Sequence, residues 1–354
     1  MRKLISLFLI LSALLCGCAE IPVQELPQPS LDPDSTGSSI LTVHYIDVGQ
    51  ADCALLESDG QYLLIDGGNK EDGQLVISYL EQQGVEELSA VVCTHAHEDH
   101  VGGLPSVLAV FPTASVYAPT KTYSSNVFDD FVYYTDQQGL EITIPAPGDE
   151  FTLSQAKITV LGPTQSYAET NDTSIVLMVE FGETRFLFTG DVETSAEGDM
   201  LDYWEGRVDW NVDVLKVGHH GSDTSSSYRL VYETDPEYAI ISVGAGNSYG
   251  HPCEEVVSRY NDAGIPMFRT DELGTILAVS DGQNVTITWE NQNAQPADVQ
   301  SAETTAVSYI GNKNSKKFHT SDCKSLPKEE NQVVFESYEE AIEAGYTPCG
   351  SCLG

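Results

Sequence analysis

One six-residue run of the sequence concentrates side chains that can bind metal ions. Residues 95–100 read His-Ala-His-Glu-Asp-His, and they directly follow an apolar stretch, residues 89–94, with the pattern of a short β-strand. A loop at a strand end lets several side chains converge on one point. Imidazole and carboxylate groups together suit Zn, Mn or Fe. The run therefore predicts a metal centre with these candidate ligands: His95, His97, Asp99 and His100.

Strand and helix patterns alternate along residues 40–290, which indicates one layered α/β domain. Strand-like runs are expected at 40–48, 53–57, 62–65, 89–94, 212–217, 238–243 and 275–289, with a further series between 141 and 191. Helices are expected at 74–83, 101–111, 194–204 and 253–263.

The spacing of the histidine run resembles the H-x-H-x-D-H signature of the metallo-β-lactamase fold superfamily. Asp66, in Leu-Ile-Asp-Gly-Gly, matches the aspartate that braces the metal loop in that family. Asp191, in Phe-Thr-Gly-Asp, matches the carboxylate that bridges two metals, and the turn His219-His220-Gly221-Ser222 matches the last histidine motif. The resemblance covers residues 40–290 and implies an αββα sandwich.

A narrower resemblance is to the hydrolase domain of the ComEC/Rec2 competence proteins. Ala51 stands where that family more often has glycine. The parent proteins carry many membrane helices, so we expect a stand-alone relative here and not a DNA channel. The motifs that carry the resemblance are Asp-Val-Gly-Gln-Ala-Asp at 47–52, Asn-Asp-Thr-Ser at 171–174, His-His-Gly-Ser at 219–222, Asn-Ser-Tyr-Gly-His-Pro at 247–252 and Arg-Thr-Asp at 269–271.

The resemblance distributes the ligands over two metals. His95 and His97 would hold the first metal, Asp99 and His100 the second, and Asp191 would bridge them. Either His220 or His219 would complete the second site. Likeness to extracellular phosphodiesterases of this fold favours His220, with His219 nearer the substrate.

The sequence lacks one histidine that many two-metal relatives have. No histidine lies between His100 and Asp191. Either the first metal has fewer protein ligands, or Asn171, Asp172 or water takes the place of the missing one. A single-metal enzyme is the alternative.

Such a centre favours a phosphodiester as substrate. Two Zn or Mn ions would keep it cationic within a chain of net charge −38, and a metal-bound water has a pKa lowered to about 7. Asp99, His219 and His251 are the candidate catalytic residues. His251 is the candidate for protonating the leaving oxygen or binding the phosphate. Ser222 and Asn247 would orient phosphate oxygens, or they are ordinary loop residues, and Asn171 is a further candidate beside the metals or the substrate.

Residues 307–354 predict a small separate module. His319 and Cys323 are spaced His-x3-Cys, and Cys349 and Cys352 are spaced Cys-x2-Cys, which is typical of a structural zinc site. The stretch resembles the metal-binding domain of Ada, with histidine at the first of four cysteine positions. The alternative is a disulfide between Cys349 and Cys352.

The N-terminus predicts export. Arg2 and Lys3 precede a short apolar run, and Leu-Cys-Gly-Cys at 15–18 resembles a bacterial lipobox with Cys18 as the acylated residue. Residues 1–18 would be the lipoprotein signal peptide, 19–39 a flexible tether and 291–306 a second linker. We therefore expect the protein on the extracellular face of the cytoplasmic membrane. An ordinary secretory signal is the alternative.

The excess of acidic over basic residues limits the classes of function that the chain can have. The chain has 54 acidic and 16 basic residues, which argues against charge-driven binding of duplex DNA. The leading hypothesis is a lipid-anchored phosphodiesterase or nuclease acting on single-stranded nucleic acid. The alternatives are an envelope phosphoesterase acting on choline or teichoic phosphoesters, and a non-catalytic metal-binding lipoprotein. The sequence identifies no protein partner.

Overall fold

The computed structural model describes residues 39–296 and 309–353, except residues 322, 337 and 351. The predicted signal peptide with Cys18, most of the predicted tether and residues 297–306 of the second linker lie outside the described residues. Within the described part of the chain, no helix is both long enough and apolar enough to cross a bilayer.

Two β-sheets form the centre of the larger domain. The first has the order β15-β14-β1-β2-β3-β4-β5-β6, and the second has the order β13-β12-β11-β10-β9-β8-β7. The strands of the first sheet are β1 Leu41–Tyr45, β2 Ala54–Ser58, β3 Gln61–Ile65, β4 Ala90–Val92, β5 Val116–Tyr117, β6 Ile142–Thr143, β14 Ile276–Ser280 and β15 Val285–Trp289. Those of the second are β7 Glu150–Leu153, β8 Ala156–Gly162, β9 Val176–Phe181, β10 Thr184–Phe188, β11 Val214–Lys216, β12 Tyr238–Ile241 and β13 Met267–Arg269.

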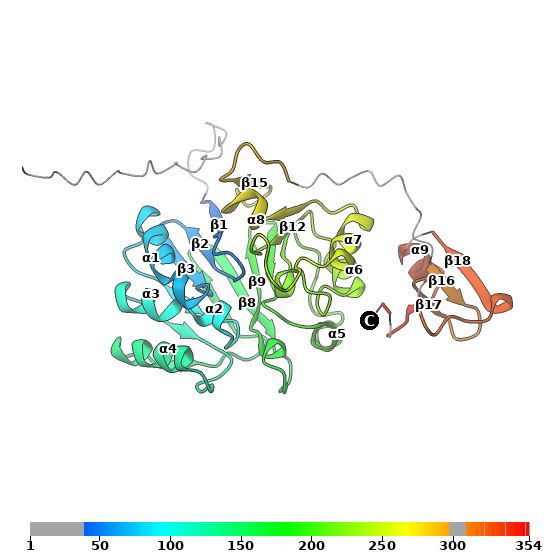
Figure 1. Ribbon diagram of the computed structural model, residues 1–354, viewed down its shortest axis with the longest axis horizontal. Coiled ribbons are helices and arrows are strands. Elements are labelled where there is room, and N and C mark those ends of the chain that lie inside the picture. Colours follow the sequence, from blue (N-terminus) through cyan, green and yellow to red (C-terminus); the bar gives the residue numbers. More distant parts are fainter. Residues whose placement is uncertain (1–38, 297–308, 322, 337, 351, 354) are drawn as a thin grey trace, which may run out of the picture.

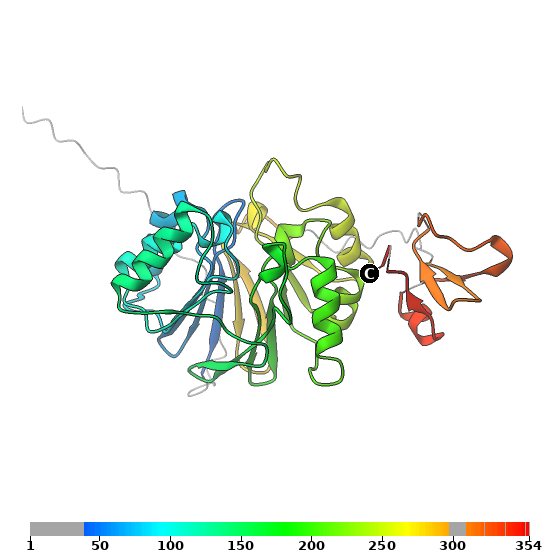
Figure 2. The same ribbon diagram turned by 90° about the horizontal axis from the view of Figure 1, so that it is seen from below.

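Helices cover the outer face of each sheet, as Figures 1 and 2 show. The first sheet is covered by α1 Gly73–Gln82, α3 Leu104–Val110 and α4 Asn126–Gln137. The second is covered by α5 Thr194–Tyr203, α6 Tyr228–Thr234 and α7 Glu254–Asp262. The short helices α2 Glu98–Val101 and α8 Thr270–Leu273 follow strand ends. The predicted αββα sandwich is therefore confirmed.

Alternating side chains in the strands build this layering. In β2, Leu56 packs between the two sheets, whereas Leu55 packs under the helices of the first sheet. In β9, Val179 lies between the sheets and Met178 lies under the helices of the second. Because successive side chains of a strand point to opposite faces, a strand buried on both sides must be apolar throughout.

The helix predicted at 101–111 is interrupted. The chain forms α2, passes through Gly102 and Gly103, and then forms α3. A Cβ atom on Gly103 would lie 2.1 Å from the carbonyl oxygen of Gly67, and the backbone nitrogen of Gly67 donates to the carbonyl oxygen of His100 over 2.7 Å. This close approach presses the loop after β3 against the histidine run.

The C-terminal module has its own sheet, in the order β18-β16-β17-β19. Its elements are β16 Tyr309–Asn312, β17 Lys317–His319, β18 Gln332–Phe335, α9 Tyr338–Glu343 and β19 Thr347–Pro348. The module contacts the larger domain through aromatic rings. Tyr338 of α9 stacks on Tyr228 of α6, with ring centroids 6.3 Å apart, and also contacts Tyr232, at 5.0 Å.

Replacing Gly103 by alanine is expected to destabilise the larger domain by about 1–3 kcal/mol, because the added methyl group has no room against the Gly67 carbonyl. Thermal unfolding of the two proteins measures the effect. Gly198→Ala in α5 is the matched control. A Cβ atom there meets nothing within 4 Å, so this variant is expected to gain about 0.5–1 kcal/mol. Equal melting of Gly103→Ala and the wild type would contradict the packing argument.

Candidate metal centre

Four side chains from three segments gather at the ends of the strands. Asp99 and His100 lie in α2, shortly after β4, Asp191 follows β10, and His220 lies in the turn that follows β11. One ligand atom of each can be chosen so that all four lie within 4.8 Å of one another. These are the four residues that the sequence assigns to the second metal and its bridge.

The donor atoms of this group fit a divalent metal ion. The Nε2 atoms of His100 and His220 are buried without a hydrogen-bond partner. They lie 3.3 Å and 3.7 Å from Oδ2 of Asp191, and Nε2 of His220 lies 3.4 Å from Oδ2 of Asp99. Tetrahedral ligands at about 2.1 Å from a zinc ion are separated by about 3.4 Å. The spacing and the unpartnered nitrogens therefore match a shared ion.

A buried carboxylate fixes the orientation of His100. Asp66 accepts hydrogen bonds from the backbone nitrogen and the hydroxyl of Thr94, both at 2.7 Å, and its Oδ2 lies 2.9 Å from Nδ1 of His100. The Thr94 hydroxyl also lies 3.2 Å from Nδ1 of His95. Both rings are thus held by Nδ1, which leaves Nε2 directed at the centre.

A buried ion pair, which the sequence did not reveal, fixes the orientation of the His220 ring. Nδ1 of His220 donates to the carbonyl oxygen of Ser242 over 3.0 Å and lies 3.3 Å from Oδ1 of Asp52. Oδ2 of Asp52 lies 2.9 Å from Nζ of Lys216, which is itself buried in β11. The lysine in the otherwise apolar strand β11 was the sequence feature that could have indicated this ion pair.

Protons and a metal ion compete for these imidazoles. Burial opposes a charge on His220, but Asp191 and Asp52 outweigh it and raise the pKa of His220 to about 10. Burial likewise opposes a charge on His100, yet Asp191 and Asp66 hold its pKa well above the usual range. A metal binds only the deprotonated ring, so binding must displace these protons.

His95, of the first predicted pair, also lies near Asp191. Nε2 of His95 lies 3.1 Å from Nδ1 of His97 and 3.9 Å from Oδ2 of Asp191. Oδ1 of Asp172, one of the candidates for the place of the absent histidine, accepts from the backbone nitrogen of Glu193 over 3.0 Å. Oδ2 of Asp191 therefore has donor groups of both predicted sets around it.

The side chains of the two neighbouring histidines in the turn Gly218–Gly221 point in different directions. His219 and His220 have φ values of 49° and 53°, a left-handed conformation that costs non-glycine residues about 1–3 kcal/mol each. His220 points inward and is buried, whereas His219 keeps 22% of its side chain exposed. Nε2 of His219 lies 3.8 Å from Oδ2 of Asp191, and its Nδ1 lies 3.0 Å from the hydroxyl of Thr224.

Glu193 ties Asn171 to this turn. Nδ2 of Asn171 donates to Oε1 of Glu193 over 3.1 Å and lies 3.4 Å from Nε2 of His219. The same carboxylate oxygen lies 3.4 Å from the hydroxyl of Thr224. The sequence pattern singled out Asn171 but neither Glu193 nor Thr224.

The centre opens into a cleft of about 520 Å³. His251 lies on its wall, and Nδ1 of His251 is buried without a hydrogen-bond partner. Burial, followed by the nearby His219 and His220, lowers the pKa of His251. Ser222 and Asn247 do not line the cleft; their side chains bond within the loops that carry His219 and His251. The cleft is lined by Gln50, Asn69, His97, Glu98, Asp99, Asn171, Asp191, His219, His220, Tyr249 and His251.

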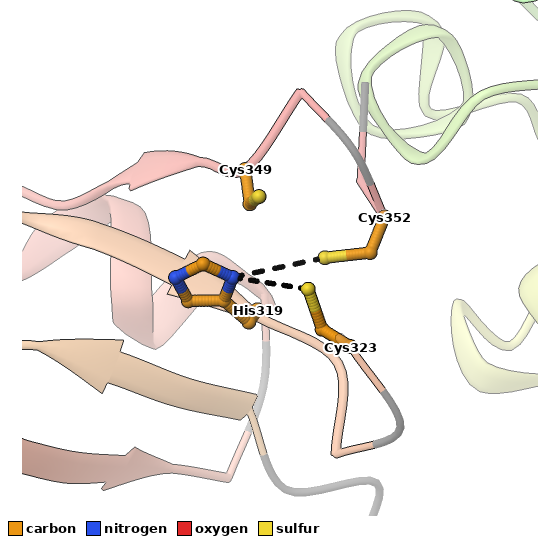
Figure 3. Close-up of side chains that lie close together, drawn as sticks. All are labelled: His319, Cys323, Cys349 and Cys352. Atoms are coloured by element: carbon orange, nitrogen blue, oxygen red, sulfur yellow. Dashed lines mark hydrogen bonds between the residues drawn. The ribbon is translucent and has the colours of Figure 1, made fainter. Parts of the chain in front are cut away.

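Figure 3 shows the predicted zinc ligands of the C-terminal module converging on one point. Nδ1 of His319 lies 3.3 Å from Sγ of Cys323 and 4.0 Å from Sγ of Cys352. Cys349, in the loop after β19, faces the same point, and none of the three cysteines is in a disulfide bond. Three thiols and one imidazole in this arrangement are a donor set that zinc prefers.

Comparison with known proteins places the chain in a family. The model of the metallo-beta-lactamase superfamily matches residues 46–245, and the chain belongs to this superfamily. The model of the metal binding domain of Ada matches residues 297–353. The chain is accordingly a metal-dependent hydrolase with a C-terminal zinc-binding module.

The curated relatives include competence proteins. ComE operon protein 3 of Bacillus subtilis is 28% identical over 253 residues, 66% of this chain and 32% of that protein. Competence protein ComA of Neisseria gonorrhoeae is 29% identical over 248 residues, 70% of this chain and 33% of that protein. This chain thus spans about a third of their length, and the predicted likeness to ComEC/Rec2 is confirmed.

Solved structures include the metallo-beta-lactamase fold protein YhfI from Bacillus subtilis. Its TM-score is 0.47 at 13% identity, and the match covers 69% of this chain and all of that one.

Asp66→Asn is expected to weaken metal binding about 10–100-fold, because an amide cannot hold the His100 ring as the carboxylate does. Competition with a chromophoric chelator measures the affinity. Asp281→Asn is the control, because Asp281 lies in an exposed turn, where its side chain accepts hydrogen bonds from the backbone nitrogens of Gln283 and Asn284. Unchanged affinity in the Asp66 variant would contradict the assigned role.

His319→Ala in the full chain is expected to lower the zinc content by about one ion per chain, because the variant removes one of four ligands from a small module. Elemental analysis after dialysis under reducing conditions gives the content. Cys253→Ser is the control, since Cys253 is a free cysteine outside both clusters. A zinc content equal to that of the wild type would reject the module's site.

Proposed function

We propose that the protein is a phosphodiesterase that uses two divalent metal ions, Zn or Mn. The observation that carries the proposal is the position of Asp191. Its Oδ2 lies 3.9 Å from Nε2 of His95 and within 3.7 Å of Nε2 of both His100 and His220, which supports a carboxylate shared by the two predicted metal sets. Two metals bridged in this way suit in-line displacement at phosphorus.

The residues divide into those that hold metal and those that meet the substrate. His95 and His97 would hold one ion, and Asp99, His100 and His220 the other, with Asp191 shared between them. Bound metal ions would supply Lewis acidity and lower the pKa of water at the centre.

His219 and His251 meet the substrate in this proposal. Their rings lie on the cleft wall with centroids 5.8 Å apart. His219, held by Thr224, orients a phosphate oxygen. His251 donates a proton to the leaving oxygen as the phosphorus–oxygen bond breaks, while a water molecule gives up a proton to the solvent and bonds to phosphorus through its oxygen.

The substrate proposed first is single-stranded nucleic acid, supported by the likeness to competence proteins. A phosphocholine-type ester of the cell envelope is the second candidate. Among the described residues, those lining the cleft include Glu98 but neither lysine nor arginine, which would suit a cationic group. For either substrate we propose a chain anchored through Cys18 on the outer face of the membrane.

The test is turnover by the full mature chain loaded with Zn or Mn. We expect hydrolysis of a single-stranded oligonucleotide and of bis-p-nitrophenyl phosphate. His251→Gln is expected to slow oligonucleotide cleavage about 100-fold but to affect the nitrophenyl ester much less, since p-nitrophenolate leaves without a proton. Asp281→Asn serves as the control, and it should match the wild type.

Two outcomes would count against the proposal. No turnover of either ester by protein with both metals bound would reject a phosphodiesterase. An equal loss on both substrates in His251→Gln would reject proton donation and leave His251 as a binding residue. Preferential turnover of p-nitrophenyl phosphorylcholine would favour the second candidate.

A further inference from the structure

Tyr249 is an exposed aromatic residue at the metal centre. Its side chain keeps 71% of its surface exposed, the largest value among the big apolar side chains of the described residues. It nevertheless lines the same cleft as His97, Asp191 and His219. An aromatic ring on the wall of this cleft offers apolar surface to a molecule that binds at the metal centre.

The loop around Tyr249 is built to hold the ring in place. Oδ1 of Asn247 accepts from the backbone nitrogens of Tyr249 and His251, both at 3.1 Å, and its Nδ2 donates to the carbonyl oxygens of Gly244 and His251. The Tyr249 ring stacks on His251, with centroids 5.6 Å apart and planes 27° apart. One face of the ring is therefore supported by the proposed proton donor.

The rest of the cleft offers little to bind a polyanion. Gln50 and Asn69 are neutral amides, and no residue on the described cleft wall is lysine or arginine. Beyond the metal-bound phosphate, a substrate must therefore be held by uncharged contacts. A tyrosine ring stacked on His251 offers one such contact, the stacking of another flat ring.

We propose that Tyr249 is the stacking platform for the nucleobase next to the scissile phosphodiester. The inference rests on the proposed phosphodiesterase function and specifies its substrate as a nucleotide chain. One ring flanked by one histidine forms a surface for a flat base. A quaternary ammonium group is usually enclosed by several aromatic rings.

Three esters with one leaving group test the inference on the metal-loaded full chain. They are thymidine 5′-(p-nitrophenyl phosphate), methyl p-nitrophenyl phosphate and p-nitrophenyl phosphorylcholine. Tyr249→Ala is expected to lower kcat/KM for the thymidine ester about ten-fold and to leave the methyl ester within two-fold, because only the first has a base to stack. Tyr249→Phe should retain the wild-type preference. Tyr133→Ala, at an exposed tyrosine of α4, is the control.

Three outcomes would overturn the inference. Equal losses on the thymidine and methyl esters would show that Tyr249 supports the cleft as a whole and contacts no base. A loss confined to the phosphorylcholine ester would assign the ring to a cation. If the wild type hydrolyses none of the esters, the phosphodiesterase proposal fails, and the base contact is then judged by calorimetric binding of thymidine 5′-monophosphate. Equal binding by the wild type and Tyr249→Ala would reject it.

Discussion

Asp191 carries its charge where only 2% of its surface reaches water, and four imidazoles lie around one of its oxygens. The distances from Oδ2 to the nearest ring nitrogens are 3.3 Å for His100, 3.7 Å for His220, 3.8 Å for His219 and 3.9 Å for His95. An isolated buried carboxylate would be strongly destabilising, so these partners must arrive together. They come from both sheets, which obliges the sandwich to bring the ends of β4, β10 and β11 to one edge.

A second set of buried groups keeps this arrangement rigid. Asp66 holds His100 from the first sheet, and the pair of Asp52 and Lys216 holds His220 across the two sheets. Each supporting carboxylate is bonded by more than one donor, so the rings have little freedom to turn. A preorganised centre needs no rearrangement when charge develops on a bound substrate, which is the main electrostatic advantage of an enzyme site.

The histidine run, Asp66, Asp191 and the zinc pattern could be recognised from sequence because each is a dense local motif. The break between α2 and α3 could not, since it arises from the approach of Gly103 to Gly67, which are distant in the chain. Helices α4 and α6 were not singled out individually. For His219 and His220, only the resemblance favoured His220 as the ligand, and the left-handed turn gives the two side chains different directions. Pairing of Lys216 with Asp52 is likewise a tertiary contact.

The position of β1 affects how the domain can be assembled. β1 lies between β2 and β14, and Leu41 pairs with Ser280 while Tyr45 pairs with Ile276. β1 is the first described strand of the larger domain and β14 is the last but one, so the two can pair only when nearly the whole domain has been synthesised. Contacts of such long sequence separation form slowly. Until β14 arrives, β1 presents an apolar open edge that can pair with another chain. Synthesis of this domain thus includes an interval in which aggregation competes with closure of the sheet.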